Sequence, residues 1–141
     1  MTNCPPQESY TIYEGRSFAV EWYYTEKGEM PAHEFYKEME ERLRARFLAL
    51  VKYLADASYG TFLPKTDYNI EDRRERIYAF KPHRARFFNF MTKGKRIVVT
   101  NAFYKHSQKL TKQDRETLGT AMRYKEDYFE RNKRGEYYEK K

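Results

Sequence analysis

Aromatic side chains must supply most of the hydrophobic core of this chain. Leu, Ile, Val and Phe together make up only about 18% of its 141 residues, and 35% of the residues are charged. This composition borders on that of disordered chains, but disordered chains are also poor in aromatic residues. Here 14 Tyr, 10 Phe and 1 Trp add a large apolar surface. The length suits one domain, so we expect a single folded domain with an aromatic-rich core.

The cysteine and histidine content and the apolar runs exclude several classes of protein. With Cys4 as the only cysteine, the chain cannot form an intramolecular disulfide or a multi-cysteine zinc site. The histidines at 33, 83 and 106 lack metal-ligand spacing, so we expect no metal and no other cofactor. No charge-free run reaches the roughly 20 apolar residues of a membrane helix, and the first residues do not resemble a secretory signal. We therefore expect a cytoplasmic protein without a membrane partner.

Positive charge is concentrated in the second half of the chain. Residues 1–70 carry a net charge of −3, whereas residues 71–141 carry +10. Within residues 73–112 there are twelve basic residues and a single acid, Glu75. Such a field attracts a polyanion, and nucleic acid is the commonest one. The alternative is a solvated basic face without a ligand, and charge alone does not separate RNA, DNA and an acidic protein.

Hydrophobic periodicity predicts one strand and one long helix in the first half. Residues 17–24 are rich in aromatic side chains and predict a strand. After Pro31, apolar residues recur every three or four positions as far as Leu54, which predicts one helix of about six turns. The residues before this strand show no sustained period, so we expect a flexible extension or a loosely docked arm over 1–16.

The second half predicts three more strands and a second helix. Residues 60–75 contain several turn-forming residues and predict a loop. The expected strands cover residues 76–80, 84–91 and 96–104. Thr111 and Asp114 have the spacing of a helix start. We expect residues 17–135 to form one α+β domain, a small antiparallel sheet built from a strand and a three-strand meander, with the long helix and the C-terminal helix on one side. Residues 136–141 are expected to be a tail.

Four segments of the sequence, taken in order, resemble one known family. They are Gly28-Glu-Met-Pro31 with Glu34-Phe35, then Ile77-Tyr-Ala-Phe-Lys81, Arg86-Phe-Phe-Asn-Phe90, and Ile97-Val-Val-Thr-Asn-Ala-Phe-Tyr-Lys-His-Ser-Gln-Lys109. Over about residues 17–131 the chain resembles the RelE/HigB-type toxins of bacterial type II toxin–antitoxin systems, in particular their phage-derived HigB-like branch. The resemblance implies a RelE-like fold and endoribonucleolytic cleavage of mRNA, typically mRNA engaged on the ribosome. It also implies a helix-turn-helix antitoxin, encoded beside the toxin, that neutralises it.

Cleavage of RNA by its own 2′-OH needs no metal, but it needs a proton-transfer group and a cation that stabilises the phosphate. A His, or a Lys of lowered pKa, suits the first role and the planar fork of Arg suits the second. We assign Arg86 as the phosphate clamp and Lys105 or His106 as the proton-transfer group. The expected RNA-binding residues around them are Lys81, His83, Arg84 and Lys109. Strand alternation predicts that Arg84 and Arg86 share a face, as do Phe103 and Lys105.

Other interpretations stay open for the same residues. His106 can be a surface histidine, and Lys109 can be a solvated residue before the last helix. His106 replaces the family's usual second Lys, and the common glutamate is absent at Ala79, which favours a catalytically inactive RNA- or ribosome-binding protein as the alternative. The acidic first half could also dock on the basic half of a second copy. Three tyrosines could stack on bases, although most tyrosines are expected in the core: Tyr104, Tyr124 and Tyr128.

Overall fold

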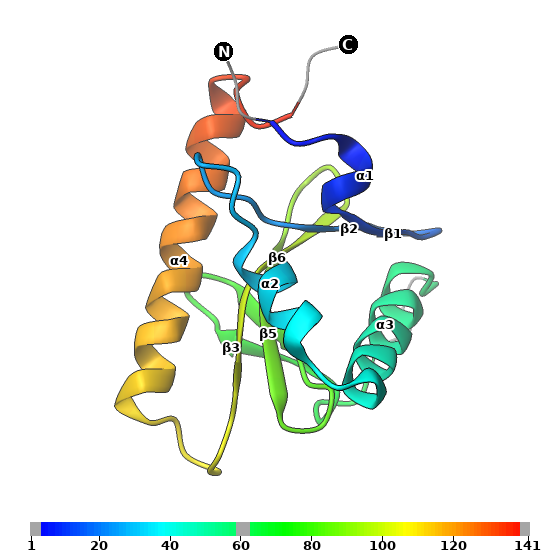
Figure 1. Ribbon diagram of the computed structural model, residues 1–141, viewed down its shortest axis with the longest axis vertical. Helices are drawn as coiled ribbons and strands as arrows, with labels where there is room; N and C mark the ends of the chain where they lie inside the picture. Colours follow the sequence, from blue (N-terminus) through cyan, green and yellow to red (C-terminus); the bar gives the residue numbers. More distant parts are fainter. Residues whose placement is uncertain (1–3, 59–62, 139–141) are drawn as a thin grey trace.

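The computed structural model of the chain describes residues 4–58 and 63–138 (Figure 1). In chain order its elements are α1 (Gln7–Tyr10), β1 (Thr11–Glu14), β2 (Ala19–Trp22), α2 (Pro31–Glu38), α3 (Glu41–Ala55), β3 (Tyr68–Asp72), β4 (Ile77–Phe80), β5 (Ala85–Met91), β6 (Arg96–Tyr104) and α4 (Lys112–Lys133). The expected helix start is confirmed, because Thr111 and Asp114 form a reciprocal capping box at the N-terminus of α4.

The strands form one mixed sheet in the order β1-β2-β6-β5-β4-β3. β2 pairs with β6 in parallel, whereas the other neighbouring strands are antiparallel. The meander of β4, β5 and β6 is present as expected. The prediction of a small antiparallel, RelE-like sheet is nevertheless wrong, because the sheet has six strands and its second and third strands, β2 and β6, are parallel. Strand periodicity cannot reveal the direction of pairing, since both directions expose the same alternate faces.

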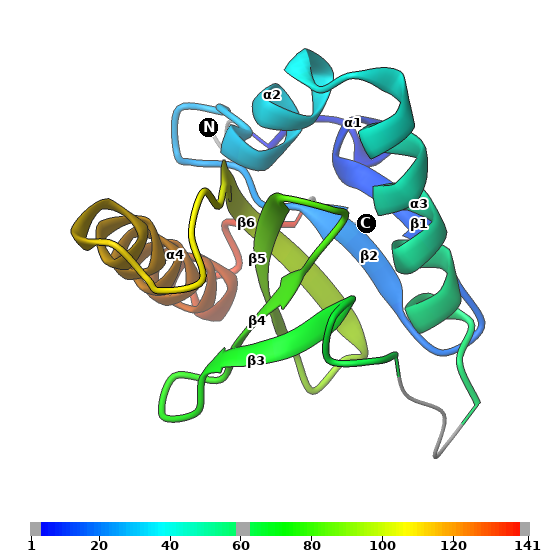
Figure 2. The same cartoon turned by 90° about the horizontal axis from the view of Figure 1, so that it is seen from below.

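The helices cover both faces of the sheet rather than one. On one face Trp22 of β2 packs against Phe47 of α3, with ring centroids 5.7 Å apart. On the other face Phe90 of β5 packs against Tyr128 of α4 at 5.2 Å. Figure 2 shows α4 on one side of the sheet and α2 and α3 on the other. The expectation of helices on a single side is therefore wrong.

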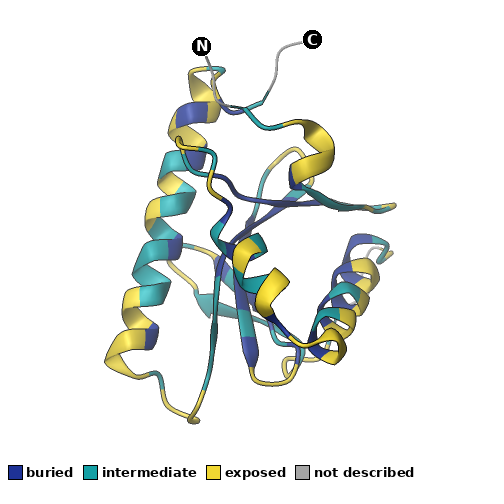
Figure 3. Cartoon of the chain, in the orientation of Figure 1, coloured by how far each residue is buried: buried dark blue, intermediate teal, exposed yellow. Residues whose placement is uncertain are grey.

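The core is rich in aromatic residues, as the composition predicts. Figure 3 shows buried residues along the central strands and on the inner sides of α3 and α4. Phe47 lies at the centre of the α3 face and contacts Phe87 at 4.1 Å and Phe80 at 5.7 Å between ring centroids. Among the described residues, the Phe side chains with no exposed surface are Phe47, Phe80, Phe87 and Phe90.

The expected long helix is two helices separated by an extended step. Met39 and Glu40 have ψ angles of 152° and 154°, so α2 ends and α3 begins in a new direction. Arg44 of α3 donates from its Nη1 to the Met39 carbonyl at 2.7 Å, which satisfies an acceptor freed by the break. The apolar period continues through the break, and for this reason periodicity alone predicts one helix.

The N-terminal segment and the predicted loop contain regular structure that the sequence did not predict, and the C-terminal segment packs into the core. Within the expected extension 1–16, residues 7–14 form α1 and the edge strand β1. In the expected loop over 60–75, residues 59–62 lie outside the described residues and residues 68–72 form β3. Tyr137, expected in the tail, is completely buried, and its ring stacks on Tyr24 at 4.3 Å. β1 and β3 are ordered by pairing with β2 and β4, and the C-terminal segment is held by packing against a distant part of the chain.

Asp56, which ends α3, holds the loop that follows β1. Its carboxylate accepts hydrogen bonds from the Tyr13 hydroxyl at 2.6 Å and from the Arg16 backbone N–H at 2.8 Å. The Tyr13 hydrogen bond is the main reason why the pKa of Asp56 lies below its usual value, and the Arg16 N–H adds to it. A lowered folded pKa contributes stability above the unfolded pKa and loses it as pH falls through the folded value.

We therefore expect acid to weaken this attachment of β1. As pH falls below about 4, the ordinary pKa of Asp, the thermal unfolding midpoint of the wild type should fall more steeply than that of Asp56→Asn. The variant keeps the shape of the side chain but cannot titrate. Identical pH dependence of the two midpoints would show that the Asp56 hydrogen bonds contribute nothing to stability.

Candidate nucleic-acid interface

Three strand ends bring the predicted site residues to one end of the molecule. β4 ends at Phe80, β5 begins at Ala85 and β6 ends at Tyr104, and these strands are antiparallel neighbours. The β4–β5 turn and the β6–α4 loop therefore lie at the same edge of the sheet, at the bottom of Figure 1. Figure 2 views the molecule from this end. We call it the basic end; its residues are Lys81, His83, Arg84, Arg86, Lys105, His106 and Lys109.

Arg86 is positioned at the start of β5 by the turn that precedes it. Its Nη1 donates to the carbonyls of His83 at 2.7 Å and Ala85 at 2.8 Å. Within the described residues, its Nε and Nη2 have no protein acceptor. Burial lowers the pKa of Arg86, while the charge of Glu71 opposes the shift; an Arg side chain nevertheless remains protonated in proteins. The guanidinium is thus fixed at one nitrogen and has donors left for an anion.

Lys105 lies on the same face of the sheet as Arg86. Arg86 is paired with Phe103 across the β5–β6 ladder, and the Lys105 N–H donates to the Arg84 carbonyl at 2.8 Å. The ladder thus continues one step beyond β6. Because Lys105 follows Phe103 by two residues, alternation places it on the face that carries Phe103 and Arg86. This register is compatible with Arg86 and Lys105 acting on the same phosphate.

Arg84 and Lys81 have protein partners that the sequence did not reveal. The Arg84 guanidinium lies 4.7 Å from the centroid of the Tyr104 ring, and Tyr104 in turn packs against Phe35 of α2 at 4.8 Å. Arg84 belongs to the turn before β5, so its head group follows Tyr104 rather than strand alternation beside Arg86. Lys81 forms an ion pair with Glu71 at 3.3 Å, with both side chains less than 20% exposed. Its charge is therefore largely neutralised before any ligand binds.

The two histidines and Lys109 lie on exposed connections. His83 is in the β4–β5 turn with a positive φ of 56°, and His106 and Lys109 are in the β6–α4 loop. In that loop the Ser107 hydroxyl donates to the Lys109 carbonyl at 2.8 Å. Within the described part of the chain, no hydrogen bond or ion pair involves the side chains of His83, His106 or Lys109. These three side chains are free to turn toward a ligand, but nothing in the protein orients them.

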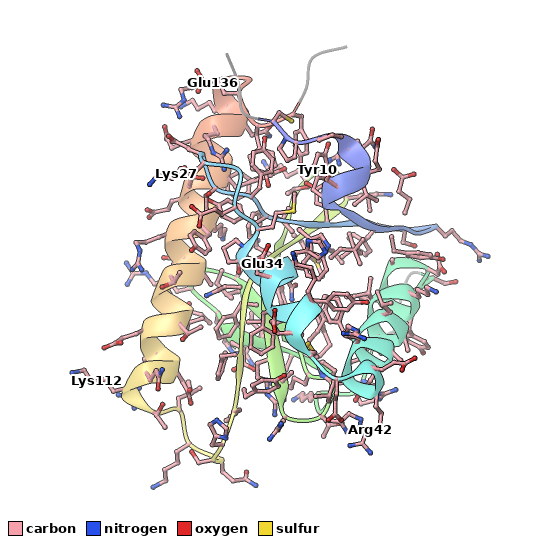
Figure 4. The ribbon with its side chains drawn as sticks, viewed as in Figure 1. Tyr10, Lys27, Glu34, Arg42, Lys112 and Glu136 are labelled. Atoms are coloured by element: carbon pink, nitrogen blue, oxygen red, sulfur yellow. The ribbon has the colours of Figure 1, made fainter. Side chains whose placement is uncertain are left out.

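The sequence prediction missed the basic residues that begin α4. Lys112 and Arg115 continue the basic end along the first turn of this helix, and Figure 4 shows Lys112 pointing outward there. The acid in the same turn, Asp114, is 7% exposed and is used by the capping box with Thr111. The dense basic run up to residue 112 was the available signal. Asp114 is thus used within the protein, and the basic residues of this end outnumber its acids.

Two of the three candidate stacking tyrosines belong to the core. Tyr128 is 1% exposed, and Tyr124 stacks on Tyr23 with ring centroids 4.7 Å apart. Tyr104 lies between Phe35 and the Arg84 guanidinium. The expectation that most tyrosines pack in the core is met at these positions, and the basic end therefore offers cations rather than open aromatic faces.

Neither a metal site nor a similar protein of known function indicates what the described residues do. Residues 4–58 and 63–138 contain no group of three or more His, Cys, Asp and Glu side chains that could hold a metal ion. In the same residues, no helix is long and apolar enough to cross a membrane. Compared with known families and curated proteins, the chain matches no family model and no curated protein. A functional proposal therefore depends on the geometry and charge of the basic end.

Proposed function

We propose that the basic end binds single-stranded RNA and cleaves it without a metal, the toxin activity that the resemblance implies. The observation that carries the proposal is the register of β5 and β6, which places Arg86 and Lys105 on one face at the same sheet edge. The free N–H groups of Arg86 are suited to two phosphate oxygens. Lys105, half-buried beside a cation-rich surface, is suited to proton transfer, with His106 as the alternative.

In the proposed reaction, the bond from phosphorus to the 5′-oxygen is replaced by a bond from phosphorus to the neighbouring 2′-oxygen of the same RNA strand. Lys105 or His106 takes the proton of the 2′-OH, and the resulting oxygen attacks the adjacent phosphorus. The bond from phosphorus to the 5′-oxygen breaks, and that oxygen takes a proton from the protonated Lys105 or His106. The products are a 2′,3′-cyclic phosphate and a 5′-OH. Arg86 stabilises the additional negative charge that develops on the phosphate oxygens in the transition state. RNA lacking the 2′-OH at the scissile position cannot react in this way.

A second candidate is RNA or ribosome binding without cleavage. It is favoured by the absence, in the described residues, of any protein group that orients the Lys105 amine or the His106 ring. A general base is usually held in place by a neighbouring group. In this candidate function the basic end is an electrostatic binding surface only, and no helix-turn-helix antitoxin is needed to protect the cell.

We expect the double substitution of Arg86 and Lys105 by Ala to abolish cleavage. The intact chain should release RNA fragments with 2′,3′-cyclic phosphate ends from free RNA in EDTA, and also from mRNA on translating ribosomes, which are assayed separately in their Mg²⁺ buffer. The double variant should be slower by at least about a hundredfold, the usual lower limit of acid–base catalysis. Its loss of two phosphate contacts should reduce the slope of log affinity against log salt by about 1.4. Growth arrest on expression should be relieved in parallel.

The matched control is Arg74→Ala with Lys133→Ala, which removes the same charge from exposed positions on the β3–β4 turn and the end of α4. This control should keep both cleavage and growth arrest, and thermal unfolding should confirm that both double variants are folded. Cleavage that survives loss of Arg86 and Lys105 would reject the site. Salt-sensitive binding by a wild type that never yields fragments would establish the second candidate instead.

A further inference from the structure

A cationic pocket lies at the end of the sheet opposite to the basic end. It is formed by the β5–β6 turn, the second half of α4 and Arg76 at the end of the β3–β4 turn. Its volume is about 600 Å³, within the range of about 300–1,000 Å³ that is typical of ligand pockets. The seven residues of β5 separate it from the basic end by about 20 Å at 3.3 Å per residue. The proposed cleavage uses none of its residues.

The cations of this pocket exceed its acids. Arg76, Lys93, Arg96 and Lys125 line it, and no Asp or Glu does. Arg96 is paired at 2.9 Å with the buried carboxylate of Glu21, which leaves the other three charges without a carboxylate partner within the described residues. Lys125 donates to the Glu75 carbonyl and thereby ties the β3–β4 turn to α4. An anion entering the pocket therefore meets about three uncompensated positive charges in positions set by the fold.

An exposed aromatic ring lies against these cations. Among the described residues, the large apolar side chains that are exposed are Tyr53, at 51%, and Phe129, at 42%. Phe129 lines the pocket, and its ring is supported from behind by Phe90 at 5.4 Å and by Tyr128 at 5.2 Å. A ring that is packed on one side and open on the other can stack on a planar ligand.

A hydrogen-bonded network holds the pocket wall beside this ring. The Tyr138 hydroxyl bonds to Glu21 and lies 2.7 Å from the Tyr128 hydroxyl. The Arg96 guanidinium lies 4.5 Å from the centroid of the Tyr138 ring while it pairs with Glu21. These contacts fix Arg96 and Tyr138 before a ligand arrives, which lowers the entropy cost of binding.

We propose that this pocket binds a nucleotide. The base stacks on the open face of Phe129, and the phosphate is held by Lys93, Arg76 and Lys125. The combination of a single open ring with several cations suits a ligand that carries both a planar base and a phosphate. A base alone or a phosphate alone would use only part of the pocket. The nucleotide is either free or part of an RNA strand whose other nucleotides lie at the basic end.

The test is isothermal titration calorimetry of the full chain with AMP, adenosine, inorganic phosphate and an RNA oligonucleotide. AMP should bind at least about tenfold more tightly than adenosine or phosphate, because both parts of the pocket are then used. Phe129→Ala should weaken binding by about tenfold or more, the effect of losing one stacked base. Lys93→Ala should weaken it less and should reduce its salt dependence.

Two substitutions outside the pocket serve as matched controls. Tyr53→Ala removes the other exposed ring, on α3, and Lys133→Ala removes an exposed lysine from the end of α4. Both should leave nucleotide binding unchanged. The Arg86→Ala, Lys105→Ala double variant should also keep AMP binding. The nucleotide pocket is thereby tested independently of the proposed cleavage site.

The titrations also identify the source of the nucleotide. Weaker AMP binding by Phe129→Ala supports a site for free nucleotide. An effect of Phe129→Ala on the oligonucleotide alone supports a site for one nucleotide of a bound strand. If phosphate binds as tightly as AMP, or if Phe129→Ala and Tyr53→Ala behave alike with every ligand, the proposal is overturned.

Discussion

Phe47→Ala is expected to lower the free energy of unfolding by about 3–5 kcal/mol, the usual loss when a fully buried Phe is truncated. The Phe47 ring has no exposed surface. It packs between the sheet and α3, against Phe87 at 4.1 Å, Phe80 at 5.7 Å and Trp22 at 5.7 Å. These neighbours are rigid rings that cannot collapse into the space left by Ala, so most of the cavity should remain. Urea denaturation followed by tryptophan fluorescence would measure the loss.

Tyr53→Ala on the same helix is the matched control. Its ring is 51% exposed, and its truncation should change the free energy of unfolding by no more than about 0.5 kcal/mol. Equal losses for the two variants would contradict the assignment of Phe47 to the centre of the core. They would also place α3 in a different orientation on the sheet.

Arg131→Ala is expected to cost about 2–4 kcal/mol, because a buried cation and its hydrogen bonds are removed together. Arg131 is 4% exposed, pairs with Asp127 at 2.8 Å and donates to the Tyr24 carbonyl. Its guanidinium also lies 4.8 Å from the ring centroids of Tyr24 and Tyr137. Its removal leaves the Tyr24 carbonyl without its donor and a gap between two rings. The estimate is below that for a fully buried ion pair because the Asp127 side chain is 28% exposed and can rehydrate.

The same substitution should release the C-terminal segment. Tyr137 is buried against Tyr24 and the Arg131 head group, so limited proteolysis after Gly135 should become faster in the variant. Arg123→Ala on an exposed part of α4, where the side chain bonds only to the Thr120 hydroxyl, is the control and should change stability by no more than about 0.5 kcal/mol. Unchanged proteolysis in Arg131→Ala would show that Tyr137 is held by other contacts.

At the basic end, the charge pattern of the sequence predicts which residues gather but not which of them have protein partners. The run of basic residues over 73–112 predicts a positive surface, and strand alternation predicts only that Arg84 and Arg86 share a face and that Phe103 and Lys105 do. The β5–β6 register is what relates Arg86 to Lys105. Neither pattern reveals that Lys81 is paired with Glu71 or that Arg84 stacks on Tyr104. These partners come from other strands and become neighbours only when the sheet forms. The pocket at Phe129 was missed for the same reason, since its cations come from the β3–β4 turn, the β5–β6 turn, the start of β6 and α4.

The amino-acid sequence by itself determined the aromatic core, the meander of β4, β5 and β6, and the start of α4. Each of these follows from periodicity or capping within a few neighbouring residues, which act through local geometry. Only the tertiary structure decided the parallel pairing of β2 with β6, the helices on both faces, the step at Met39 and Glu40, the regular structure of residues 7–14 and the burial of Tyr137. These features depend on contacts between residues far apart in the chain. Such contacts produce no periodic pattern in the sequence of either segment.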